Sequence, residues 1–192
     1  MRFDQLEFAA IDFESSGFGA DGKDEPIQIG VAIMRSGKMA TGEGLRSFIV
    51  PSSPRPISDA AYAVHRIGSE QLEGAPSMLE LWPEIRSRLA GKVVVAHGAG
   101  TEKRFLRAFP MHGFGPWLDT LPLARKVVAG VPDYSLGTLV ERFGLVPELR
   151  RLCPDLDWHD AMFDAAASLL LLAELVNSAK IGEAPLESLG IA

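Results

Sequence analysis

The chain has 192 residues, of which 47% are hydrophobic and 23% are charged, proportions that are usual for a globular protein. Its 19 basic and 25 acidic residues give a formal net charge of −6, which argues against attachment to nucleic acid through a broad basic surface. That charge does not exclude an enzyme that captures one strand end through metal ions. Residues 1–192 are expected to form a single domain with its own hydrophobic core, because no internal repeat or linker divides them.

The expected cellular compartment follows from three features. The one cysteine, Cys153, cannot form a disulfide within the chain, which favours a reducing cytoplasm. The N-terminal residues carry acids and no long apolar core, so no signal peptide is expected. The longest apolar run, near Leu169 to Ala173, is too short to cross a bilayer. We therefore expect a cytoplasmic protein that does not bind a membrane.

Three strands are predicted near the start of the chain. Residues 6–11 (LEFAAI) form an apolar run that leads into an acidic pair. In residues 27–34 every second side chain is a branched apolar one, which is the period of a strand. A turn near Gly37 then leads to a third strand at residues 45–50, so the three strands should form an antiparallel meander.

The remainder of the chain predicts helices that alternate with two short strands, at residues 92–96 and 114–118. Ser58 and Ser77 are expected to cap the helices that follow them. This order of elements favours an α/β fold in which helices cover a mixed sheet. Four further helices are expected at residues 101–109, 120–128, 135–143 and 160–177.

An acidic pair ends the first predicted strand. Asp12 and Glu14 are two residues apart, so their side chains should point to the same face of the strand. The next three residues, SSG, are small enough to leave room for a ligand. A D-x-E pair taken alone is most simply a solvated strand end.

Three further polar side chains fall at the ends of predicted elements. Asp164 lies on an otherwise apolar helix face, where a lone carboxylate should be paired or bound to a metal. His159 lies five residues earlier and can lean toward this carboxylate from the preceding loop. Glu102 begins a helix directly after a buried strand. Singly, Glu102 would complement a helix dipole and His159 would be a cap or a half-buried histidine. Taken together with the acidic pair, they predict one cleft.

These motifs resemble the DEDDh family of 3′–5′ exonucleases, which includes polymerase proofreading subunits, RNase T and oligoribonuclease. The resemblance covers residues 8–175 and keeps the family's order of motifs. The first motif is DFESSGF, and the third, H-x-x-x-x-D, is HDAMFD. The second motif, H-N-x-x-F-D-x-x-F-L, aligns with HGAGTEKRFL at residues 97–106. The segments IQIGVAIM and YSLGTLVERFGL are also similar to family sequence.

The resemblance implies an RNase H-like α/β fold, in which helices flank a mixed five-stranded sheet. It implies a hydrolase that removes nucleoside 5′-monophosphates from single-stranded 3′ ends. Asp12, Glu14 and Asp164 would bind two Mg²⁺ or Mn²⁺ ions, with Glu102 helping at the outer ion. His159 would be the general base, because an imidazole can accept a proton from water near neutral pH. Oxygen ligands without cysteine suit these hard cations better than zinc.

The family's substrate pocket implies roles for four more residues. Phe18 corresponds to the residue that wedges against the terminal bases, and backbone near Ser15 and Ser16 would contact the terminal sugar. His65 matches a position that lines the same pocket. Phe18 is equally well explained as a loop aromatic that covers the edge of the core. His97 is interpreted as structural.

Two departures from the family pattern leave alternatives open. Glu102 stands where the family has aspartate, and the longer side chain can hold a metal, directly or through water, or displace it. A catalytically weak exonuclease-like binding module is therefore one alternative. Residues 147–158 form a longer lead into the third motif than compact members show, and we expect them to shape the substrate cleft.

The expected partners are single-stranded DNA or RNA 3′ ends. DNA is slightly favoured, and RNA trimming like that of oligoribonuclease or RNase T is the other alternative. The short stretch after Asn177 favours a stand-alone nuclease over a tethered proofreading subunit. Family members occur as dimers and as polymerase-bound monomers, so a homodimer and a polymerase partner both stay open.

Overall fold

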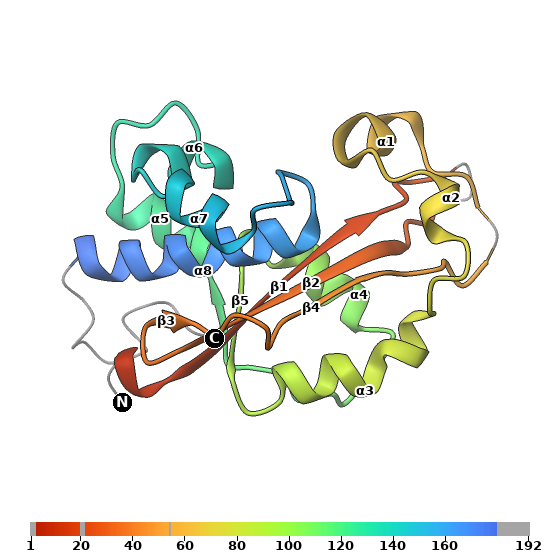
Figure 1. Cartoon of the computed structure of the whole chain (residues 1–192), viewed down its shortest axis with the longest axis horizontal. Helices are drawn as coiled ribbons and strands as arrows, with labels where there is room; N and C mark the ends of the chain where they lie inside the picture. The colour runs from red at the N-terminus through yellow and green to blue at the C-terminus, as the bar shows by residue number, and fades with distance from the viewer. Residues whose placement is uncertain (1–2, 20–21, 54, 180–192) are drawn as a thin grey trace.

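A mixed sheet forms the centre of the protein in a computed structural model that describes residues 3–19, 22–53 and 55–179 (Figure 1). Its strand order is β3-β2-β1-β5-β6, and β4 also pairs with β2. β1 runs antiparallel to β2, whereas β5 and β6 run parallel to β1. The RNase H-like α/β prediction is confirmed, and the five predicted strands are joined by a sixth of two residues, β3. The strands are β1 (Glu7–Ser15), β2 (Pro26–Arg35), β3 (Lys38–Met39), β4 (Leu45–Phe48), β5 (Val93–Ala96) and β6 (Trp117–Asp119).

The meander of the first strands forms as predicted. Ser36 and Gly37 both have positive φ angles, 49° and 71°, which is the backbone that a tight two-residue hairpin turn requires. The turn joins β2 to β3, and β4 then pairs with the other half of β2. The ladder continues one step past β4, because the Ile49 N–H donates to the Ile27 carbonyl at 2.8 Å.

Eight α-helices and a short 3-10 helix occur among the described residues. Ser58 and Ser77 are N-caps, as predicted, and each hydroxyl accepts from the backbone N–H three residues later. α7 was not predicted and overlaps the first half of the long lead into the third motif, residues 147–158. The helices are α1 (Asp59–His65), α2 (Ser69–Leu72), α3 (Met78–Leu89), α4 (Gly100–Leu106), α5 (Thr120–Val127), α6 (Leu136–Arg142), α7 (Val146–Leu152) and α8 (Ala161–Ser178).

Helices cover both faces of the sheet, and each face has its own hydrophobic cluster. α5, α6, α7 and α8 lie over one face, where Phe8 and Ala10 of β1 are buried (Figure 1). α3 and α4 lie over the other face, where Ile11 and Phe13 are buried. This alternation along β1 follows the period of two that its sequence predicts. Glu14, the residue after Phe13, therefore points to the face covered by α8.

α8 is the central helix of the larger cluster. Within the described part of the chain it is the helix whose length and composition would suit a membrane span. In this fold Phe163 and Leu169 are fully buried, and the helix packs against β1 and β2. The apolar character of α8 is thus explained by the protein core. Residues 180–192, which contain most of the stretch after Asn177, lie outside the described residues.

Candidate active site

Two of the predicted acids lie on β1, on the face that α8 covers. Asp12 and Glu14 share this face with the buried Ala10, so the prediction that both carboxylates point the same way is confirmed. Each is partly buried in the folded chain. They therefore face the start of α8, which carries the third sequence motif.

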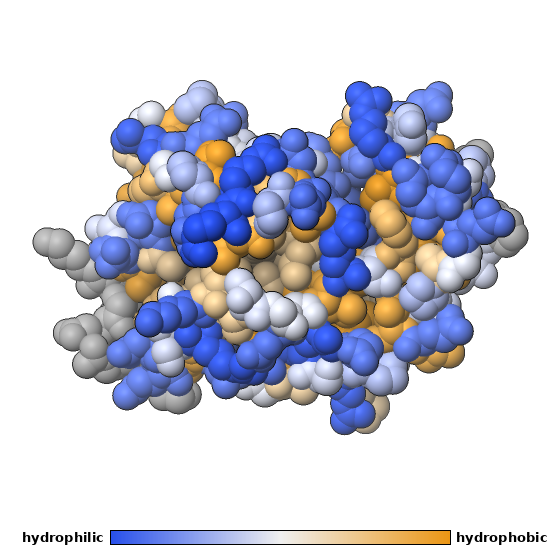
Figure 2. All heavy atoms as spheres, in the orientation of Figure 1, coloured by the Kyte–Doolittle hydropathy of each residue, from blue (hydrophilic) through white to orange (hydrophobic). Residues whose placement is uncertain are grey.

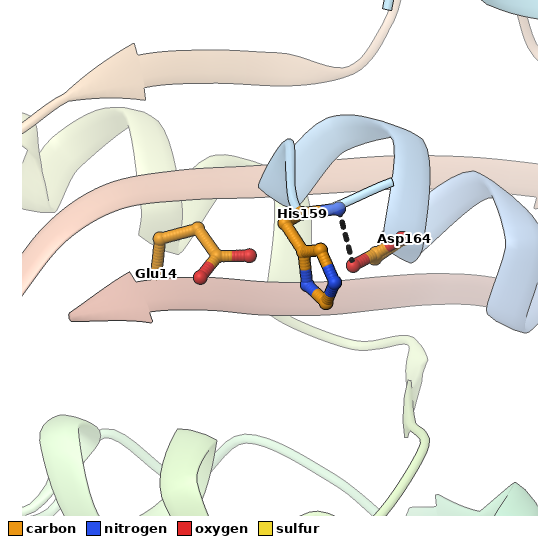
Figure 3. Close-up of side chains that lie close together, drawn as sticks. All are labelled: Glu14, His159 and Asp164. Atoms are coloured by element: carbon orange, nitrogen blue, oxygen red, sulfur yellow. Dashed lines mark hydrogen bonds between the residues drawn. The ribbon is translucent and has the colours of Figure 1, made fainter. Parts of the chain in front are cut away.

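Glu14, His159 and Asp164 form the tightest part of the site. One ligand atom from each residue lies within 4.8 Å of the other two (Figure 3). Glu14 reaches in from β1, whereas His159 comes from the turn before α8 and Asp164 from the first turn of that helix (Figure 3). His159 has a left-handed backbone with φ 65°, an uncommon conformation for a residue other than glycine. In this backbone conformation, the His159 N–H donates to Asp164 Oδ2 at 3.3 Å.

Asp12 and Glu102 complete the group, although neither belongs to the tight set of three. Burial, followed by the negative charges of Asp164, Glu102 and Glu14, raises the pKa of Asp12 well above its usual value. Four carboxylates from β1, α4 and α8 thus lie close enough to repel one another. The predicted convergence of distant acids beside one imidazole is what the fold produces.

Two carboxylate oxygens of the site are buried without a hydrogen-bond partner among the described residues, Glu102 Oε2 and Asp164 Oδ1. A buried, unpartnered carboxylate oxygen is costly, because it has lost water and gained no donor. A divalent cation removes this cost and is held best by several carboxylate oxygens. The donors present, oxygens and one imidazole, therefore suit a hard divalent cation.

Burial and the crowding of negative charge raise the pKa values of the carboxyl groups at this site. Burial, followed by the charges of Asp164 and Asp160, raises the pKa of Glu14 to about 8. Burial is the main cause that raises the pKa of Glu102 to about 7 and that of Asp164 to about 7. Protons or cations must therefore bind this site near neutral pH.

Glu102 is presented to the site by a turn that Asp119 holds together. The carboxylate of Asp119, at the end of β6, accepts from the Gly98 and Ala99 N–H groups at 2.8 Å each. It also accepts from Leu121 and so caps α5. α4 begins directly after this turn, and Glu102 in its first turn is only 5% exposed. Asp119 was not predicted as part of the site, although an acid between a strand and a helix is a recognisable cap.

Comparison with known proteins identifies the family. A family model described as Exonuclease (RNase_T) matches residues 9–172. A DNA polymerase III subunit epsilon-like protein of Rhodobacter capsulatus is 30% identical over 92% of this chain, which spans 25% of that relative. The solved structure of Exonuclease X in complex with 5′ overhanging duplex DNA is 26% identical, with a TM-score of 0.71 over 90% of this chain and 93% of that one. The chain belongs to the DEDDh exonuclease family.

Two further relatives differ in how much of their own length this chain covers. DNA polymerase III subunit epsilon of Aquifex aeolicus is 30% identical over 71% of this chain and 68% of its own length. A PolC-type DNA polymerase III of Thermotoga petrophila is 33% identical over 76% of this chain, which covers 10% of the polymerase. The chain thus spans a quarter or less of the lengths of the two relatives from Rhodobacter and Thermotoga.

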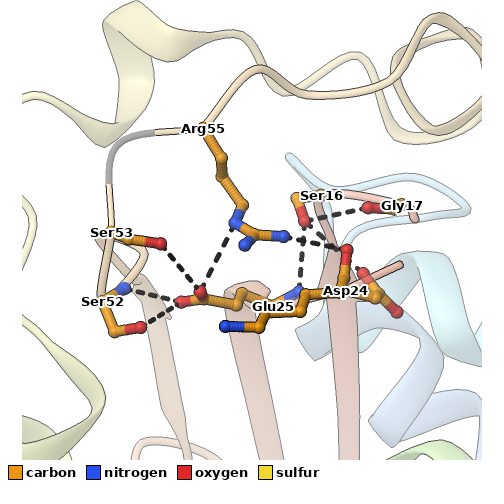
Figure 4. A network of polar contacts seen from close by, with 8 residues as sticks. Ser16, Gly17, Asp24, Glu25, Ser52, Ser53 and Arg55 are labelled. Carbon is orange, nitrogen blue, oxygen red and sulfur yellow. Dashed lines mark hydrogen bonds and ion pairs between the residues drawn. The ribbon is translucent and has the colours of Figure 1, made fainter. Parts of the chain in front are cut away.

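The loop after β1 is held by a polar network rather than left open. Ser16 is fully buried, and its hydroxyl accepts from the Glu25 N–H at 3.1 Å (Figure 4). The Glu25 carboxylate accepts from the Ser52 N–H at 2.6 Å and lies 3.4 Å from Arg55 Nε. The Ser16 backbone donates to the Glu25 carbonyl and accepts from the Ser58 N–H, at 2.9 Å each. Ser16 therefore has a structural role that sequence reasoning missed.

His65 contacts the end of β1, and Phe18 lies in the loop that follows this strand. Ile67 N–H donates to His65 Nδ1, so His65 Nε2 carries a proton and donates it to the Ser15 carbonyl at 3.1 Å. Phe18 is 68% exposed, which excludes the interpretation that it covers the edge of the core. The Arg104 guanidinium lies 5.5 Å from the Phe18 ring and is paired with an aspartate of the same loop.

A cavity of about 510 Å³ opens beside His159. His65 and Val64 line one side of it, and Trp158 and Asp160 line the other. Figure 2 shows this part of the surface hollowed between the lobe that contains α1 and the lobe that contains α6 and α7. The volume lies within the range of roughly 300–1,000 Å³ that ligand pockets span. His97, in contrast, contacts Thr120 and the Tyr134 carbonyl and is structural, as predicted.

We predict that the metal-free protein loses stability as the pH rises. The site carboxyls bind protons more tightly in the folded chain, because their pKa values are about 7 to 8 there instead of 3.8 to 4.5. The stability they contribute is present at about pH 4 and is lost as the pH rises through about 8. Glu14→Gln removes one of these charges and should raise the melting temperature at about pH 8 by about 2–4 °C or more.

Thermal unfolding in a chelator at about pH 5 and about pH 8 measures this effect, with the exposed α6 substitution Glu141→Gln as the control. Added Mn²⁺ should stabilise the wild-type protein more at the higher pH, because protons compete with the ion. If Glu14→Gln changes the melting temperature by the same amount at both pH values, relative to the wild type, the described crowding of like charges is contradicted.

Proposed function

We propose that this exonuclease domain hydrolyses single-stranded nucleic acid from the 3′ end with two Mg²⁺ or Mn²⁺ ions, releasing nucleoside 5′-monophosphates. The observation that carries the proposal is the meeting of four acids from β1, α4 and α8 with the imidazole of His159, where two carboxylate oxygens are buried without a partner among the described residues. Oxygen donors of this kind suit divalent cations. Membership of the exonuclease family supports the type of reaction.

Each residue of the site receives a role in this proposal. Asp12, Glu14 and Asp164 would hold the ions, and Glu102 would help from α4 at the outer ion. Bound ions would supply the positive charge that activates water and stabilises the leaving 3′ oxygen. The carboxylates orient this charge, because β1 and the start of α8 fix them on opposite sides of the site (Figure 3).

His159 would accept the proton of the attacking water. It is exposed, and its ring lies against Glu14 and Asp164 in the same cluster. The hydrogen bond from its backbone to Asp164 ties the position of the imidazole to that of a carboxylate. A general base must lie within hydrogen-bond reach of the water that it deprotonates, so this link serves positioning.

The 3′-terminal nucleotide would bind beside the imidazole, in the cavity that His65 lines. Phe18 would wedge against the bases, since it is an exposed aromatic ring within a few residues of Glu14. Backbone near Ser15 and Ser16 would contact the terminal sugar. The Ser16 N–H and carbonyl are already used and Ser16 is fully buried, whereas Ser15, whose carbonyl accepts from His65, is only partly buried, so Ser15 would make more of this contact.

The proposal favours DNA over RNA. Its support comes from relatives named as DNA polymerase III subunits and from the likeness to Exonuclease X, whose structure contains duplex DNA. These names also support a polymerase as a partner, while a homodimer is a separate proposal. We propose that the protein is cytoplasmic and forms one exonuclease domain. Its one cysteine is free and buried, and one sheet joins the described strands.

We predict that Asp12→Asn and Asp164→Asn each lower the rate of monophosphate release by more than about 100-fold, since loss of an indirect metal contact alone typically costs about 10–100-fold. A 5′-labelled single-stranded oligonucleotide with Mg²⁺ or Mn²⁺ gives the rate and shows from which end the strand shortens. Glu141→Gln, exposed on α6, serves as the matched control. Full activity in either aspartate variant would refute the assigned site.

A second prediction concerns the glutamate at the position where the family has aspartate. If Glu102 helps to hold an ion, Glu102→Gln should weaken Mn²⁺ binding and slow hydrolysis by about tenfold or more. Glu102→Asp keeps the charge and should retain most of the activity. Calorimetric titration with Mn²⁺ separates this enzyme from a catalytically weak binding module, which need not bind ions. Wild-type protein that binds no Mn²⁺ would favour the binding module.

A third prediction tests the sugar preference. DNA and RNA strands of matched sequence should both be shortened, with a higher kcat/KM for the DNA strand. The discrimination depends on the fit of one 2′ hydroxyl in the pocket near Ser15 and His65. Faster removal of ribonucleotides would assign the protein to RNA trimming and would leave the metal site unaffected.

A further inference from the structure

The active site is assembled from two halves that no covalent bond holds at a fixed distance. Asp12 and Glu14 belong to β1, whereas Asp164 belongs to the first turn of α8 and His159 to the turn directly before that helix. The neighbouring strand β2 joins these halves, because it pairs with β1 and also packs against α8. The residues of β2 opposite the two acids therefore decide how closely α8 approaches them.

The residue paired with Asp12 across the sheet is Gly30. A Cβ at Gly30 would lie 2.1 Å from the carbonyl carbon and oxygen of Ala161 and 2.2 Å from the Met162 nitrogen. Carbon atoms in good contact are about 3.5–4.0 Å apart, so any larger residue would push the helix backbone away by roughly 1 Å or more. The first turn of α8 thus lies directly on the backbone of β2, beside Asp12.

The residue paired with Glu14 is Gln28, and it connects the sheet to the same turn. Its side chain is only 1% exposed and uses both ends of its amide. Gln28 Nε2 donates to Asp160 Oδ2 at 2.9 Å, and the Ala161 N–H donates to Gln28 Oε1 at 2.9 Å. Asp160 is the N-cap of α8 and directly follows His159.

Arg46 of β4 also binds Asp160. Its Cα is paired with Gly30, so Arg46 is the next residue across the sheet. Arg46 Nε donates to both carboxylate oxygens of Asp160, at 2.8 and 3.0 Å, and Nη2 donates to Oδ2 at 2.6 Å. A two-pronged arginine contact fixes direction as well as distance, which a lysine cannot do.

We propose that Gly30, Gln28 and Arg46, here called the α8 seat, set the distance between the two halves of the metal site. They are positioning residues, since they act through Asp160 and the α8 backbone. This inference rests on the proposed metal-dependent exonuclease function. Widening the gap by about 1 Å would misplace His159 and Asp164 relative to Glu14, and such a shift can cost about 100-fold in rate.

The test compares Gly30→Ala and Arg46→Met with Arg35→Met. Arg35 is also an arginine in an ion pair on the sheet, but it lies at the far end of β2 and pairs with Glu7 and Glu43. Calorimetry measures the Mn²⁺ affinity, and hydrolysis of a single-stranded oligonucleotide gives kcat and KM. Thermal unfolding shows whether each variant is folded. We expect both seat variants to bind Mn²⁺ about tenfold more weakly or worse. Their kcat should fall while KM changes little. Excess Mn²⁺ should restore part of the activity, and Arg46→Lys, which keeps the charge but loses the two-pronged contact, should be more active than Arg46→Met.

The wild-type protein in the same experiment separates the two proposals. If the wild type neither binds Mn²⁺ nor shortens the strand, the proposed function fails and the seat has no metal site to position. If the wild type is active and the seat variants keep its Mn²⁺ affinity and kcat, the seat inference alone is overturned. Equal losses in Arg35→Met would also overturn it, because the effect would then follow general stability. Arg46 is 40% exposed, so Arg46→Met decides the matter should Gly30→Ala fail to fold.

Discussion

Repulsion among the buried carboxylates at the junction of β1 and α8 is the constraint on which the rest of the structure depends. Burial raises the pKa of Asp12 and of Glu14, the charge of Asp164 raises both further, and the charge of Glu102 adds to the effect on Asp12. A fold tolerates such crowding only if protons or cations neutralise it. The unpartnered oxygens of Glu102 and Asp164 mark where this compensation is needed.

Hydrophobic packing supplies the energy that holds the acids together against this repulsion. α8 buries one side against β1 and β2, and fully buried residues such as Phe8 and Phe163 come from the sheet and the helix. The opposite face of β1 is anchored by Ile11 and Phe13 under α3 and α4. β1 is thus fixed on both faces, so Asp12 and Glu14 cannot move apart from α8 by bending of the strand.

Local patterns in the sequence predicted most of the elements and the members of the site. The alternation in residues 27–34, the caps Ser58 and Ser77 and the apolar strand before Asp12 depend on neighbours along the chain, and the structure has them nearly where expected. The D-x-E pair and the H-x-x-x-x-D motif identified the acids and the imidazole for the same reason. α7 was missed because its seven residues start with Val-Pro and follow a turn, a pattern more typical of a loop.

The sequence by itself thus determined which residues bear charge, which strands and helices form, and which family the chain resembles. Only the tertiary structure decided that Gly30 lies against the α8 backbone and that Gln28 and Arg46 donate hydrogen bonds to Asp160. It also decided that the Ser16 hydroxyl accepts a hydrogen bond from the Glu25 N–H. Gln28 and Asp160 are 132 positions apart, and no local pattern reports a contact at that separation. Such contacts arise from packing a helix on a sheet, where shape and distance between elements select the residue.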